Sequence, residues 1–314
     1  MPLFEGRKRR PGDRKDGFRI HNLDPMGRLI PYIMKTRADS WVLFEERLEI
    51  TPAQKLVRRL SREGYPGMSL YHLLFAGIVR AMSQIPQMNR FVMNNNVYAR
   101  NDIKFSMVVK KGMNTEGDRT MILPHFQPED TIYDVYNSIK AELDKVDRTT
   151  KVSEDENKQG FDLLEFTLSI LPDWLLRAAI GLLKLLDRHG LIPKKITDLS
   201  PFHTSCFITN MGSFGMESVY HHIYEFGTTS IFGALGKKEF EYELDKDGSR
   251  IRRTYIRLRF VVDERIVGGF EYGAGFKIIK NCFVHPEQLL TAPAAVVADI
   301  IDRKGRKQKN KKPD

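Results

Sequence analysis

A run of strict alternation in the last third of the chain constrains the fold more than any other feature. From Arg253 to Phe260, arginine or tyrosine alternates with threonine or an apolar residue. Since successive side chains of a β-strand point to opposite faces, the run predicts a strand with one buried and one polar face. Asp247-Gly248 before it predicts a hairpin turn. We interpret the arginine face as solvated, although phosphate binding is the alternative.

Helical and strand patterns alternate along the rest of the chain. Ser69 precedes apolar residues at three- and four-residue spacing, which predicts a buried helix that ends before Pro86. Thr51, Pro52 and Gln54 form a capping-box pattern and predict another helix. The order of elements indicates an α/β fold with a mixed sheet flanked by helices. Further helices are expected at 132–146, 271–281 and 292–302, and strands at 41–50, 97–100, 103–109, 121–124, 205–210 and 230–235.

The positive charge of the chain is concentrated at its two ends. Fifty Lys and Arg against 40 Asp and Glu give a net charge of +10, but residues 1–17 and 303–314 hold most of the excess. We interpret these two segments as basic disordered tails around one domain, residues 18–302. A nearly neutral body argues against a nucleic-acid interface, although a nucleic-acid-binding arm is the alternative role of the tails.

A helical insertion of about 161–195 stands apart from the rest of the pattern. Leucines share one face of a helix that starts at Pro172-Asp173 and ends at Gly190. This face suits docking on the body, covering a ligand tunnel, or lying on a membrane surface. Its charged residues argue against a transmembrane span, and two cysteines with no signal-peptide pattern favour a cytoplasmic protein.

Three segments, in this order, resemble the catalytic domain of 2-oxoacid dehydrogenase dihydrolipoyl acyltransferases and of chloramphenicol acetyltransferase. The first is 69–109, with its IPQMN turn; the second is 206–215, CFITNMGSFG; the third is 263–269, DERIVGG. The resemblance covers most of residues 18–291. It implies the coenzyme-A-dependent acyltransferase fold and a homotrimer, or a multiple of one, with its active site between subunits.

The same resemblance assigns roles to residues of the second and third segments. Thr209 occupies the position of a serine whose hydroxyl stabilises the oxyanion, and the resemblance implies that Asn210 and Gly212 contact coenzyme A. Asp263 and Arg265 match the family motif as supporting residues.

Glu264 stands where the family has its catalytic histidine, and Gly268 stands where it has Asp or Asn. The family partner of that Asp is an arginine near the N-terminus, here Arg28. A carboxylate is a weaker base than histidine. Burial would raise the pKa of Glu264 and make it a stronger base, whereas pairing with Arg28 would lower that pKa. His221 or His222 is an alternative base, and hydrogen-bonded structure is the competing interpretation of both.

The resemblance implies transfer of an acyl group from coenzyme A, used as co-substrate, to an unidentified acceptor. The alternative is a noncatalytic trimeric scaffold or ligand-binding relative. The chain has no lipoyl domain pattern, so the acceptor is expected to be a small molecule or a lipoylated partner. We expect no metal site, because His221 and Glu225 lack a third ligand at a suitable spacing.

Overall fold

The computed structural model describes residues 3–4, 7–110, 119–152 and 172–299, and within them a mixed seven-stranded sheet forms the centre. Its main path runs β2-β10-β9-β8-β5-β6, and β7 pairs with β5. Strand β8 is parallel to β5 and β9, whereas the other pairs are antiparallel. The strands are β2 (Trp41–Glu49), β5 (Ile103–Lys110), β6 (Arg119–Ile122), β7 (His125–Phe126), β8 (Cys206–Asn210), β9 (Ile231–Leu244) and β10 (Arg250–Asp263).

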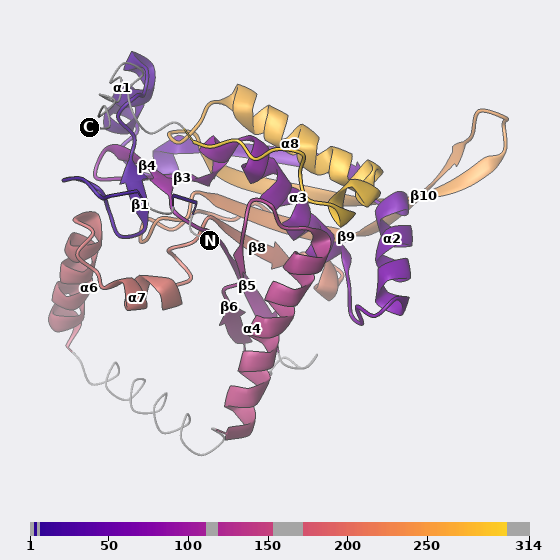
Figure 1. The fold of residues 1–314 in the computed structure, drawn as a ribbon, viewed down its shortest axis with the longest axis horizontal. Coiled ribbons are helices and arrows are strands. Elements are labelled where there is room, and N and C mark those ends of the chain that lie inside the picture. The colour runs from indigo at the N-terminus through magenta and orange to yellow at the C-terminus, as the bar shows by residue number, and fades with distance from the viewer. Residues whose placement is uncertain (1–2, 5–6, 111–118, 153–171, 300–314) are drawn as a thin grey trace, which may run out of the picture.

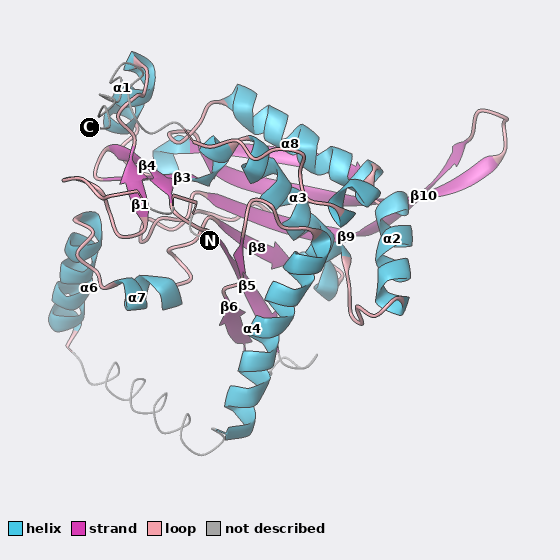
Figure 2. Cartoon of the chain, in the orientation of Figure 1, coloured by secondary structure: helices cyan, strands magenta, loops and turns pink. Residues whose placement is uncertain are grey.

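Helices cover one face of this sheet and build the main core with it (Figure 1). The central helix, α3 (Leu70–Gln84), is buried on almost every side because it packs on β5 and β8 and lies against α8 (Gly269–Val284), which packs on β2 and β10 beside it. Ser69 and His72 form a capping box at its start. Helices α2 (Thr51–Arg62) and α4 (Ile132–Val152) extend this layer, as Figure 2 shows.

Most of the expected elements are confirmed, with boundaries shifted by a few residues. The strand pair β9–β10 is longer than predicted and turns at Gly248, which has the positive φ of 82° expected for that hairpin. The helix expected at 292–302 is wrong over its described residues, 292–299, which run without regular structure. This segment is held by tertiary contacts instead: the Val297 amide donates to the Ser83 carbonyl, and Asp299 pairs with Arg90.

A small three-stranded sheet, β1-β4-β3, lies beside the central one. The tail predicted for residues 1–17 is wrong for 7–17, because Arg14 in this segment is buried and bound to Asp16 and Asp187. Residues 303–314 lie outside the described residues. The elements are β1 (Gly17–Arg19), α1 (Pro25–Ile33), β3 (Arg90–Met93) and β4 (Asn96–Arg100).

The arginine face of β10 is covered by paired charges. Arg257 binds Glu45 and Glu239 at 3.2 Å each, and Arg259 binds Glu45 at 2.7 Å. Glutamates of the neighbouring strands therefore neutralise these arginines, so the face offers no excess of positive charge for phosphate. Further pairs join Arg253 to Glu49 and Glu243, and Arg47 to Glu239 and Glu241.

The described part of the predicted insertion forms α6 (Asp173–Arg188), and α7 (Lys194–Leu199) begins at its end and extends beyond residue 195. Asp187 anchors it, because this buried carboxylate binds Arg14 at 3.0 Å and His203 at 3.2 Å. The buried ammonium of Lys104 donates to the carbonyls of Thr197 and Asp198, at 3.0 and 3.2 Å. The rest of α6 is largely exposed. Within the described residues, none of the helices has the length and apolarity that crossing a membrane requires.

Candidate functional site

Thr209 lies near the C-terminal end of β8, half-buried and opposite Ala234 of β9. The preceding residue is fixed by α3, since the Tyr71 hydroxyl donates to the Ile208 carbonyl at 2.8 Å. Burial and the nearby Cys206 thiol raise the pKa of Tyr71 well above its usual value, so this donor stays protonated. The position of Thr209 is thus set by the packing of α3 on β8.

Asn210 and Gly212 shape the backbone just after Thr209. The Asn210 side chain accepts from the Ser213 amide at 3.2 Å and caps the short helix Met211–Phe214. A Cβ on Gly212 would lie 2.4 Å from the Gly236 carbonyl oxygen. Both residues therefore have structural tasks at this turn, whatever they contact in a ligand.

A cavity of about 540 Å³ opens beside this turn. Asn210 and Gly212 line it together with three cationic side chains, Arg58, Lys237 and Lys238. Its volume falls in the range of small-molecule sites. Polar and apolar residues complete the wall, among them Gln54, Ser69, Ser213, Met68, Leu235 and Ile256.

The third segment of the sequence motif forms a rigid turn at the end of β10. Arg265 donates two hydrogen bonds to Asp263, from Nε to Oδ1 at 2.8 Å and from Nη2 to Oδ2 at 2.7 Å. Both side chains are buried. Ser40 donates to the same carboxylate at 3.0 Å, and Arg265 also donates to the carbonyls of Met34 and Lys35. Bidentate pairs of this kind fix geometry strongly. Asp263 and Arg265 thus hold the turn that carries Glu264.

Glu264 itself is half-buried between these two residues. Its amide donates to the Ser40 carbonyl at 3.0 Å. The buried Tyr272 phenol of α8 has a pKa raised well above its usual value by burial, then by Asp263, Cys206 and Glu264. The Glu264 carboxylate therefore lies close enough to Tyr272 to act on it electrostatically.

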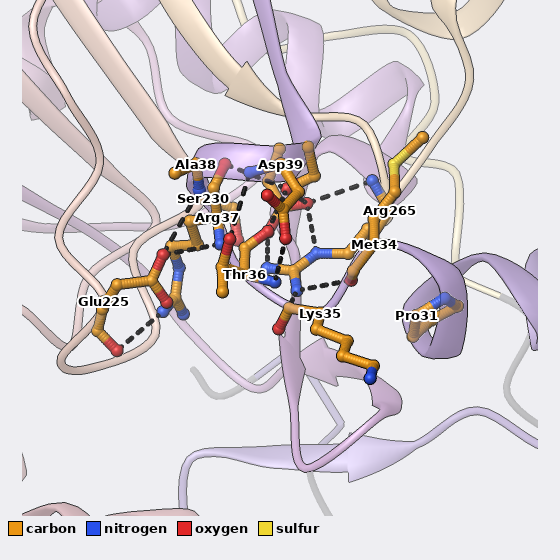
Figure 3. A network of polar contacts seen from close by, with 12 residues as sticks. Pro31, Met34, Lys35, Thr36, Arg37, Ala38, Asp39, Glu225, Ser230 and Arg265 are labelled. Atoms are coloured by element: carbon orange, nitrogen blue, oxygen red, sulfur yellow. Dashed lines mark hydrogen bonds and ion pairs between the residues drawn. The ribbon is translucent and has the colours of Figure 1, made fainter.

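Arg28 lies away from the motif at 263–269. It is exposed on α1, where it lines a separate cavity with Arg19 and Tyr32, and the structure shows no ion pair between Arg28 and Glu264. Arg37, which was not predicted, is a second arginine near Asp263 besides Arg265, and the field of Asp263 counteracts the lowering of the Arg37 pKa by burial. Arg37 donates to the carbonyl of Glu225 (Figure 3). It also donates to the carbonyl of Gly227, at 2.7 Å. No periodicity or motif around Arg37 indicates this position.

The two alternative bases lie at the same end of the sheet as Glu264. The His221 ring stacks on Phe232 with centroids 4.4 Å apart, and burial followed by His222 lowers its pKa. The His222 ring stacks on Trp41 at 6.4 Å, and Trp41 pairs with Asp263 across β2 and β10. Among the described residues, no three His, Cys, Asp or Glu side chains group closely enough to hold a metal ion.

Thr209 and Glu264 are not neighbours within one chain. Val262 lies opposite Ile231 on β9, whereas Thr209 lies opposite Ala234 on its other side. Five residues of offset along the strands and two strand spacings separate the two positions by roughly 15–20 Å. A single chain therefore presents them at different places on the sheet.

No family model matches the sequence, and no curated protein matches it. Solved structures are similar in fold. A probable dihydrolipoamide acetyltransferase from Listeria monocytogenes superposes with a TM-score of 0.50 at 13% identity, covering 94% of this chain and 100% of that one. The catalytic core of a 2-oxoacid dehydrogenase complex from Thermoplasma acidophilum gives 0.49 at 14% identity, covering 85% and 98%. A chloramphenicol acetyltransferase gives 0.46 at 9%, covering 83% and 98%.

The fold comparison agrees with the motifs read from the sequence. The similarity to the Listeria protein extends over nearly the whole chain and includes the mixed sheet with helices on one face. At this level of identity it concerns the architecture. The chain has an α/β fold, with a mixed sheet and helices, that is similar to the fold of the probable dihydrolipoamide acetyltransferase from Listeria monocytogenes.

Proposed function

We propose that the protein transfers an acyl group from coenzyme A to an acceptor, as a homotrimer or a multiple of one. The acceptor nucleophile attacks the thioester carbonyl and gives its proton to Glu264. The Thr209 hydroxyl donates a hydrogen bond to the oxyanion that forms. Collapse of the intermediate expels the coenzyme A thiolate, which takes up the proton, and leaves the acyl group on the acceptor.

The observation that carries this proposal is the cavity of about 540 Å³ at the turn that follows Thr209, where Asn210 and Gly212 line it. Its cations Arg58 and Lys238, and Lys237, which also pairs with Glu217 at 3.2 Å, suit the phosphates of coenzyme A, because phosphate binds best where positive charge is fixed. Its apolar residues suit the uncharged arm that carries the thiol. The reactive end of the cofactor would then reach Thr209 around the end of β8, because side chains alternate along a strand and Thr209 lies on the face opposite to that of Ile208.

The proposal requires an assembly, because one chain does not bring Thr209 and Glu264 together. Thr209 and Glu264 lie at different places on the sheet, so a shared site needs Glu264 from one subunit and Thr209 from another. The acceptor is a small molecule or a lipoylated partner protein. Two free, buried cysteines, Cys206 and Cys282, are in keeping with a reducing compartment such as the cytoplasm.

The second candidate is a noncatalytic trimeric scaffold or ligand-binding relative. This candidate is favoured because an acid, Glu264, stands at the position of the base. The residues on either side of it, Asp263 and Arg265, bind one another. Such a protein has the same fold and cavity and binds coenzyme A or a related ligand, but it does not catalyse acyl transfer.

The test is release of free coenzyme A thiol from acetyl-coenzyme A, with dihydrolipoamide and small alcohols and amines as acceptors. We expect Glu264→Gln to lower the rate by about 10²- to 10⁴-fold and Thr209→Val by about 10²- to 10³-fold. Glu129→Gln, an exposed acid away from the motif, is the matched control and leaves the rate unchanged. Sedimentation should give a trimer or a multiple of one.

Two results would contradict the transferase. Turnover that neither substitution changes would remove Glu264 and Thr209 from the reaction. Binding of coenzyme A by a trimer that shows no turnover with any acceptor would favour the noncatalytic relative.

A further inference from the structure

A second cavity, of about 530 Å³, lies between the insertion and the body. Helix α6 forms one wall, and the end of α1, the β3–β4 turn and residues 225–226 form the others. This helix belongs to the insertion, which none of the three acyltransferase-like segments contains. The cavity is lined by Pro31, Lys35, Arg37, Val92, Met93, Asn94, Asn95, Lys184, Asp187, Arg188, Glu225, Phe226 and Arg265.

The charges around this cavity do not balance. Its two acids have cationic partners: Asp187 binds Arg14, and Glu225, which accepts from the Arg37 amide at 2.7 Å, lies in the field of the Arg37 guanidinium. Within the described residues, Lys35, Lys184 and Arg188 have no acidic partner, and all three are exposed at the rim. Arg188 is oriented by a hydrogen bond from Nε to the Asn94 side chain at 2.8 Å. Three cations therefore face the cavity without compensation.

An unused donor lies deeper in the same cavity. The Arg37 side chain is 3% exposed, and its Nη1 and Nη2 donate to the carbonyls of Glu225 and Gly227. Its buried Nε has no partner. Leaving a buried donor unpaired is costly, and an acceptor that enters the cavity would relieve that cost.

We propose that this cavity binds a molecule that carries a phosphate monoester next to an apolar group. A dianionic phosphate matches several uncompensated cations better than a single carboxylate does. The apolar walls, with Val92, Met93 and Phe226, receive the rest of the molecule. The phosphate belongs either to a soluble ester or to a lipid headgroup, because α6 also exposes Trp174 and Leu182 on its surface.

The first test measures binding of phenyl phosphate to the full chain by titration calorimetry in low salt, without coenzyme A. We expect the double variant Lys35→Ala/Lys184→Ala to bind about tenfold more weakly, since each exposed cation contributes modestly. Lys277→Ala/Lys280→Ala, two exposed lysines of α8 that line no described cavity, is the control and keeps the affinity. Binding should also weaken as salt is added.

Benzyl alcohol and vesicles complete the design. The uncharged alcohol should bind much more weakly than phenyl phosphate. Vesicles of phosphatidylcholine with phosphatidic acid test the lipid source, and binding to them that depends on the same two lysines supports the site even where phenyl phosphate binds poorly.

The proposal is overturned if neither phosphate probe binds. It is also overturned if the double variant binds them as the wild type does, or if benzyl alcohol binds equally well. Because both lysines are exposed, the thermal midpoint of the double variant should match that of the wild type. Acyl transfer is not measured in any arm, so failure here is independent of the function proposed above.

Discussion

Gly212 illustrates how a residue placed in a ligand site by resemblance also has a packing task. Its neighbour across the turn is the Gly236 backbone, at a distance that no side chain tolerates. The motif in the sequence shows that a glycine stands here, and only the approach of β9 explains why.

We expect Gly212→Ala to destabilise the protein by about 1–3 kcal/mol, because the added methyl group forces the two backbones apart. Chemical denaturation measures the change. The control is Gly273→Ala in α8, where an added Cβ meets nothing within 4 Å, and where alanine should stabilise the helix by about 0.5–1 kcal/mol. Equal effects of the two substitutions would refute the steric argument.

At the level of single residues, the sequence predicted some positions and missed others. Asp263 and Arg265 were recognised as supports from their motif, and the structure brings them into one ion pair. Arg37 was missed because its neighbours Glu225 and Gly227 lie far away in the sequence. Long-range partners of this kind leave no local pattern.

Helix α3 shows the same contrast for a whole element. Its apolar spacing and its Ser69 cap predicted it well, yet the imidazole of His72 completes the cap. Burial lowers the pKa of His72 from 6.5 to about 4. Between these two pH values, His72 is therefore protonated in the unfolded chain and neutral in the folded protein. Stability therefore falls as the pH drops from about 6.5 towards 4.

Replacing His72 by Gln should remove this acid sensitivity, because a glutamine at the third helical position can still accept from the Ser69 amide. We expect the wild type to lose about 2–3 kcal/mol more than His72→Gln across that pH range. Urea unfolding at several pH values measures it, with the exposed His189→Gln as the control. Parallel pH profiles of wild type and His72→Gln would count against the buried imidazole.

The segment 292–299 explains why one element was predicted wrongly. Its alanines and valines suit a helix, but its backbone and side chains find partners on Ser83, Gln84 and Arg90 instead. Tertiary contacts override the helix propensity of a short segment that lies against the core of the protein. The longer strands and helices of the sheet layer, whose patterns are regular, were predicted with shifted ends, whereas the two-residue strand β7 was not predicted.

For the molecule as a whole, the attachment of the insertion can be tested through Asp187. We expect Asp187→Ala to release α6, since it leaves the buried Arg14 without one of its two acids; breaking a buried pair typically costs about 3–5 kcal/mol. Limited proteolysis should then cut residues 172–199 faster while the central sheet stays resistant.

Asp173→Ala, at the exposed start of the same helix, is the matched substitution and should leave the cleavage rate as it is. Unchanged protection in Asp187→Ala would mean that contacts other than this carboxylate fasten α6.

The overall architecture was predictable because three short motifs in a fixed order indicated the fold, and the similarity to a solved acyltransferase structure supports that prediction. The placement of residues 7–17 was not, because their many charges resemble a solvated tail. Arg14 is buried only because Asp16 and Asp187 compensate it. Sequence composition cannot show a charge whose partner comes from a helix more than 150 positions away.

Lys104 has a consequence for how this chain can change over time. Its ammonium sits in the body, yet both carbonyls that receive it come from α7 and its end. A descendant that deleted residues 173–199 would strand a cation inside the protein, so the shortened chain would need an uncharged side chain at position 104. We therefore expect the loss of α6 and α7 to be accompanied by the replacement of Lys104.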